Sequence, residues 1–127
     1  MNKLILVGIG GFIGATLRYL LSAYVQNMTQ NAIFPYGTFA VNMIGCFLIG
    51  MGAYLVETQS GMTSEMRLLL LVGLLGSFTT YSTYSSETVT LLQGQRVLLA
   101  LVNSVAHLVI GLSAVVLGRL TMGVLWK

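Results

Sequence analysis

Four long apolar runs constrain what this chain can fold into more than any other feature of its sequence. A membrane-spanning helix needs about 20 apolar residues, so 127 residues suffice for four such helices and short loops. Only 7% of the residues are charged, against about 25% in a soluble domain. The runs therefore predict an all-α membrane protein, a single domain over 1–127 with spans at 4–24, 36–56, 66–93 and 97–125. A net charge of only +3, scattered along the chain, argues against nucleic acid as a partner.

The basic residues give only a weak preference for one orientation in the membrane. Four spans with short loops place both termini on one side. Four basic residues lie toward that side and two toward the other; they are Lys3, Arg67, Arg119 and Lys127, then Arg18 and Arg96. This bias favours termini inside without enforcing it, so both orientations stay open. A small protein without an internal repeat can still build inverted symmetry by pairing two oppositely inserted copies.

Residues 76–88, inside the third apolar run, carry a hydroxyl on ten of thirteen side chains. A bilayer core disfavours polar groups without partners, so this hydroxyl tract predicts a path filled with water or ions. Gly76 at its start indicates where the helix opens, and the carbonyls freed in a broken membrane helix can hold a small cation. An unbroken helix, with hydroxyls bonded to carbonyls four residues earlier, accounts for one or two hydroxyls and poorly for ten.

The first two spans carry one strongly polar side chain each. Gly10 and Gly14 form a GxxxG motif that permits close helix contact, and Arg18 shares a face with Gly11 and Gly14. Arg18 is either an arginine that reaches lipid headgroups or part of an anion vestibule. Asn42 is either a hydrogen-bond clamp between helices or an amide donor to an anion, with the clamp slightly favoured.

The aromatic and polar residues of the third and fourth spans have two possible interpretations, a functional site or ordinary packing between helices. Tyr81 and Tyr84, three residues apart, project to one side of the helix, and Asn103 and His107, four apart, form a short polar stripe. The chain has one histidine and one cysteine, Cys46, which excludes a catalytic zinc site on ligand count. It also lacks a GxSxG elbow, so the sequence predicts no enzyme.

The string from Gly73 to Thr88, GLLGSFTTYSTYSSET, closely resembles the signature of the CrcB/Fluc fluoride channel family. Two further family features match: Arg18 lies in GATLRY and Asn42 in YGTFAVNMIG. The likeness covers the whole chain in length, four spans and order of motifs. It implies a multi-pass channel of the cell membrane that passively conducts and exports fluoride, lowering its cytoplasmic level. It also implies an antiparallel, dual-topology homodimer in which the third helix breaks in mid-membrane.

The resemblance also implies roles for individual residues. Backbone carbonyls of Gly76 and Thr79 from each subunit would hold a central structural sodium ion. Two pore phenylalanines of the family are replaced here by Tyr81 and Tyr84, and a motif glycine by Ser77. These replacements leave two alternatives: a channel that conducts more slowly, or one subunit of a heterodimer with a paralogue. The candidate residues of the fluoride path are Arg18, Asn42, Thr80, Tyr81, Ser82, Thr83, Tyr84 and His107.

Two other function classes compete with a fluoride channel. A proton-coupled exporter of the small-multidrug type, also with four spans, needs a membrane-embedded carboxylate; the first span has none, and Glu87 lies toward the end of the third. A structural membrane subunit that transports nothing leaves the hydroxyl tract unexplained. Fluoride efflux from liposomes separates the three classes.

Overall fold

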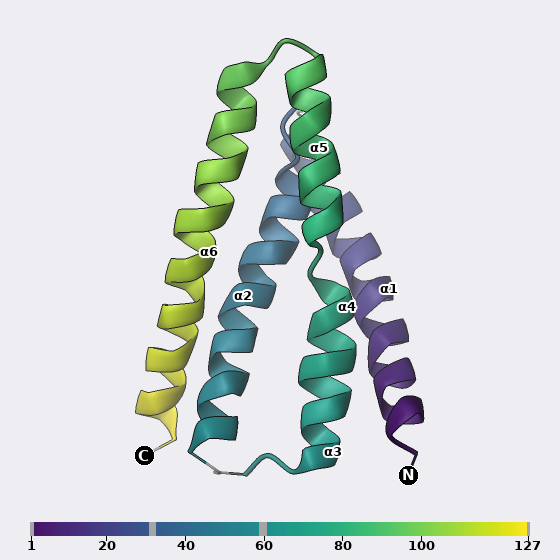
Figure 1. The fold of residues 1–127 in the computed structure, drawn as a ribbon, viewed down its shortest axis with the longest axis vertical. Helices are drawn as coiled ribbons and strands as arrows, with labels where there is room; N and C mark the ends of the chain where they lie inside the picture. The colour runs from purple at the N-terminus through teal and green to yellow at the C-terminus, as the bar shows by residue number, and fades with distance from the viewer. Residues whose placement is uncertain (1, 31–32, 59–60, 127) are drawn as a thin grey trace.

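The chain folds into four helical spans that run back and forth along one axis, with both termini at the same end (Figure 1). The computed structural model describes residues 2–30, 33–58 and 61–126, so Lys127 lies outside the described residues. The helices long and apolar enough to cross a membrane cover Lys3–Thr29, Tyr36–Glu57, Ser64–Gln93 and Val97–Leu125. The predicted all-α membrane architecture with four spans is therefore confirmed. The first helix extends five residues beyond the predicted end at residue 24.

Local sequence signals mark the helix ends. Helix α1, Lys3–Thr29, is capped by Asn2, whose Oδ1 accepts from the Leu4 N–H at 3.1 Å. Helix α2, Tyr36–Glu57, begins directly after Pro35, the single proline of the chain. Helix α6, Val97–Leu125, follows a tight turn in which Gln95 has a φ of 57°.

The third span is built from four helical pieces with a break between the last two. A short helix α3, Ser64–Met66, leads into a π-helix η1, Arg67–Leu75, and then into α4, Gly76–Phe78. The chain resumes as helix α5, Tyr81–Gln93. The predicted break in this span is confirmed.

The break lies at Thr79–Thr80 and not at Gly76, so the predicted opening point is wrong. Gly76 keeps right-handed helical angles, φ −62° and ψ −31°. Thr79 has a ψ of 154° and Thr80 a φ of −149°, both extended. Extended backbone suits the β-branched Thr79 and Thr80, but other threonines of this span, such as Thr83 and Thr88, are helical, so residue type alone does not set the position.

Close backbone contact joins the helices in two pairs, α1 with η1 and α4, and α2 with α6. A Cβ atom on Gly14 would overlap the backbone carbonyl of Leu74, and one on Gly118 would overlap that of Phe47. The contact that the GxxxG motif of α1 predicts is thus confirmed, with η1 as the partner. Figure 1 shows how the break in the third span lies beside α2, midway along the spans.

Candidate functional site

Asn42 on α2 holds the broken backbone of the third span. Its Oδ1 accepts from the Thr80 N–H at 2.9 Å, and its Nδ2 donates to the Thr80 carbonyl at 3.1 Å. Both residues are 8% exposed, so these backbone groups have little access to water. A buried peptide group outside a helix needs such partners, because leaving a buried donor or acceptor unpaired costs about 1–3 kcal/mol. Asn42 thus forms a hydrogen-bond clamp between two spans, which is one of the two interpretations that its sequence position allows.

His107 on α6 extends this clamp to a third helix. Its Nε2 lies 3.2 Å from Nδ2 of Asn42, and its Nδ1 lies 2.9 Å from the Asn103 carbonyl one turn earlier. The ring packs edge-on against Phe39, with centroids 5.1 Å apart, and beside the ring of Tyr84 at 4.3 Å. The imidazole is thus fixed by two hydrogen bonds and two aromatic neighbours.

The break frees the two carbonyls that the resemblance assigns to a sodium ion. In a continuous helix, the N–H groups of Thr80 and Thr83 would donate to the carbonyls of Gly76 and Thr79. Here the Thr80 N–H donates to Asn42, and the Thr83 N–H donates to Oγ1 of Thr80 at 3.2 Å. Gly76 and Thr79 both line a pocket of about 630 Å³ that opens at the surface of the chain.

The two tyrosines of the hydroxyl tract line the same pocket. Their ring centroids are 5.5 Å apart, which confirms that Tyr81 and Tyr84 project to one side. Tyr81 is 80% exposed, although it is the first residue of α5, inside the span Ser64–Gln93. We call the pocket of about 630 Å³ the break pocket. Its lining includes Asn42, Cys46, Gly76, Thr79, Thr80, Tyr81, Tyr84, Ser104 and His107.

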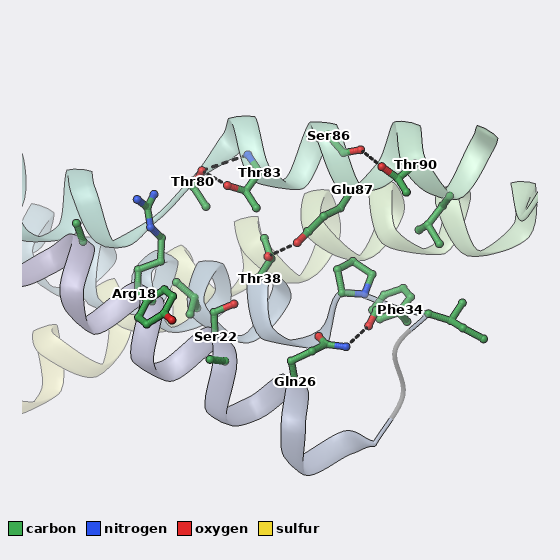
Figure 2. Close-up of a pocket in the computed structure, with 17 residues that line it drawn as sticks. Arg18, Ser22, Gln26, Phe34, Thr38, Thr80, Thr83, Ser86, Glu87 and Thr90 are labelled. Atoms are coloured by element: carbon green, nitrogen blue, oxygen red, sulfur yellow. Dashed lines mark hydrogen bonds between the residues drawn. The ribbon is translucent and has the colours of Figure 1, made fainter. Parts of the chain in front are cut away.

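A second pocket, of about 720 Å³, also has Thr80 in its lining (Figure 2). We call it the arginine pocket. Figure 2 shows the Arg18 side chain rising from α1 toward the stretch that carries Thr80 and Thr83. Thr80 is the candidate residue shared by the two pockets, and its Oγ1 contacts the hydroxyls of Ser82 at 3.2 Å and Thr83 at 3.0 Å.

The predicted site residues therefore fall into two groups, one in each pocket, and Thr80 belongs to both. The break pocket holds Asn42, Tyr81, Tyr84 and His107. Arg18 and Thr83 belong to the arginine pocket; Ser82 reaches the site through Thr80. Within the described residues, no three His, Cys, Asp or Glu side chains gather to hold a metal.

Sequence reasoning missed the pairing of Thr38 with Glu87. The Thr38 hydroxyl donates to Oε1 of Glu87 at 2.6 Å, and both residues line the arginine pocket with Arg18. The other carboxylate oxygen of Glu87 is buried and has no hydrogen-bond partner among the described residues. A signal was present: Thr38 lies four residues before Asn42, and therefore on the same face of α2.

Comparison with known proteins assigns the family. The family model described as CrcB-like protein, camphor resistance (CrcB), matches residues 5–119. The chain is 46% identical over 121 residues to fluoride-specific ion channel FluC 1 of Methanosarcina acetivorans, covering 95% of this chain and 91% of that protein. It is 42% identical to FluC 3 of Methanosarcina barkeri, over 94% and 89% of the two chains. It is 39% identical to FluC of Maridesulfovibrio salexigens, over 97% and 96%. The chain therefore belongs to the CrcB-like family.

Proposed function

We propose that this protein is a passive, fluoride-selective ion channel of the cell membrane that exports fluoride. The observation that carries the proposal is the clamped break, where Asn42 holds Thr80 between two pockets lined by hydroxyls, tyrosine rings and an arginine. The family and the curated relatives, each a fluoride-specific ion channel, support the same ion.

The chemistry of the two pockets suits a small anion. Fluoride is strongly hydrated, so a path through the membrane must replace its water with hydrogen-bond donors. Hydroxyls of Thr80, Ser82 and Thr83 supply such donors along the tract. Arg18 raises the anion concentration at the mouth of the arginine pocket. The route from one pocket to the other passes Thr80, which lines both.

Fluoride efflux from liposomes tests this proposal. We expect vesicles with reconstituted protein to lose a fluoride gradient quickly, while a chloride gradient persists. Protein-free vesicles are the control for leakage. Equal fluxes of the two anions would reject the selectivity, and fluoride flux that requires a proton gradient would favour a coupled exporter.

A second copy of the chain, inserted in the opposite direction, is the proposed cover for the break pocket. Non-helical backbone at membrane depth is tolerated only where protein or a water-filled cavity surrounds it. Gly76 and Tyr81 are exposed in the single chain, and the pocket that contains Thr79 opens to the surface. The weak charge bias allows both orientations, which an antiparallel homodimer requires.

A structural sodium ion at the dimer centre is the proposed occupant of the freed carbonyls. Gly76 and Thr79 offer neutral oxygen donors whose helical N–H partners bond elsewhere. Neutral ligands suit a monovalent ion better than a divalent ion, which favours carboxylates. A fixed positive charge there would lower the electrostatic cost of moving an anion through the membrane.

Terminal tags and sodium replacement test the dimer and its ion separately. We expect a tag on either terminus to be accessible from both sides of the membrane. We also expect the dimer fraction in detergent to fall when sodium is replaced by N-methylglucamine. One orientation throughout would reject the antiparallel homodimer and leave a heterodimer with an oppositely inserted paralogue. A dimer fraction independent of sodium would reject the structural ion alone.

A further inference from the structure

The contact between His107 and Asn42 fixes more than the position of two side chains. Each hydrogen bond around it has only one possible direction, because most of the partners are donors only or acceptors only. The backbone N–H of Thr80 can only donate, so the atom of Asn42 that lies 2.9 Å from it must be the amide oxygen. The amide nitrogen then faces the Thr80 carbonyl and the imidazole.

The protonation of the imidazole follows from the same reasoning. The Asn42 amide nitrogen only donates, so Nε2 of His107 must accept and carries a lone pair. The Asn103 carbonyl only accepts, so Nδ1 of His107 must carry the proton. Both conditions are met by one species, the neutral imidazole protonated at Nδ1.

We propose that His107, as the neutral tautomer protonated at Nδ1, is the positioning residue that aims the Asn42 amide at the break. Asn42 has two N–H groups; one donates to Thr80, and His107 accepts from the other. This directional acceptor holds the amide plane, so that Asn42 can satisfy both backbone groups of Thr80. His107 thereby acts through Asn42 on the backbone of the third span.

The surroundings of the imidazole support a fixed orientation. Phe39 meets the ring at an interplanar angle of 87° and Tyr84 at 41°, one from α2 and one from α5. Asn103, which anchors Nδ1 through its carbonyl, is fully buried and donates from its own Nδ2 to the Thr88 hydroxyl at 2.8 Å. No acidic or basic side chain is among the partners recorded for the imidazole in the described part of the chain.

Nitrogen NMR tests the tautomer directly, and independently of transport. His107 is the only histidine of the sequence, so labelling with ¹⁵N-histidine gives signals from one imidazole. We expect, for protein in lipid bilayers near neutral pH, a protonated Nδ1 and an unprotonated Nε2, which resonate far apart. A protonated Nε2 in the wild-type protein would overturn the inference.

Two amide variants test the positioning role, which rests on the proposed fluoride conduction. In His107→Gln, the side-chain oxygen can reach the place of Nε2 and accept from Asn42. In His107→Asn, the shorter side chain reaches only the place of Nδ1 and leaves Asn42 without this partner. We expect His107→Gln to keep most of the wild-type fluoride flux and His107→Asn to lose about tenfold.

The pair of variants separates positioning from simple space-filling. Both replacements are uncharged amides, and variants are compared only when both reconstitute as monodisperse protein. Equal flux through His107→Gln and His107→Asn would overturn the inference. A wild-type protein that shows the predicted tautomer but conducts no fluoride would reject the proposed function and leave the hydrogen-bond assignment intact.

Discussion

Replacing Asn42 by alanine is expected to abolish most of the fluoride flux. The change removes the hydrogen-bond partners of both the N–H and the carbonyl of Thr80, a residue that is only 8% exposed. It also removes the hydrogen-bond partner of His107 Nε2. Each buried polar group left unpaired costs about 1–3 kcal/mol, so the clamped backbone loses its preferred conformation. Since about 1.4 kcal/mol corresponds to a factor of ten, we expect the flux to fall by at least about tenfold. Efflux from liposomes at equal protein content measures the loss.

Ser113→Ala on α6 is the matched control for Asn42→Ala. The Ser113 hydroxyl donates to the Val109 carbonyl of its own helix at 2.8 Å on an exposed face. Removing it leaves the Val109 carbonyl in its helical environment, so flux should stay at the wild-type level. Wild-type flux in Asn42→Ala would contradict the clamp, because no other described side chain bonds to both backbone groups of Thr80.

Apolar length was sufficient to predict the architecture of this chain. Four runs of about 20 residues or more can satisfy their backbone groups in lipid only as helices, which leaves few alternatives. The break in the third span was also predictable, because ten hydroxyls in thirteen residues do not suit an unbroken lipid-facing helix. Its position was not, because it depends on where a partner helix offers hydrogen bonds. Asn42 meets Thr80 and not Gly76, so the chain opens at the threonines.

Polar positions within each span could be read from the sequence, but the contacts between spans could not. The polar positions of single spans were visible as helical spacings, for example Asn103 with His107. Contacts between spans depend on helix rotation and register, which one sequence does not fix. The bond between Thr38 and Glu87 joins residues 49 positions apart, and the bond between Asn42 and His107 joins residues 65 apart. Such pairings are visible only in the folded structure, where the helices lie side by side.

Isoleucine at position 81 or 84 is expected to cut the fluoride flux strongly, about tenfold or more. Isoleucine removes the aromatic ring, whose positive edge can face an anion, and also the hydroxyl. Tyr81 is 80% exposed in the single chain, so its loss should leave the fold of one chain intact. Tyr84 also packs beside His107 at 4.3 Å, so Tyr84→Ile should disturb the Asn42 clamp as well. We therefore expect the larger loss at position 84.

Phenylalanine at the same two positions separates the ring from the hydroxyl. If ring edges are sufficient, Tyr81→Phe with Tyr84→Phe restores the family pattern and keeps or raises the flux. If the phenols are the donors in use, the same double change lowers it. We expect the first result, because the hydroxyls of Thr80, Ser82 and Thr83 lie on the same tract and can donate without the phenols. Liposome efflux for the double phenylalanine variant and for each isoleucine variant decides between them. Wild-type flux in both isoleucine variants would assign the rings to packing, since a residue that lines the path cannot lose its ring and hydroxyl without effect.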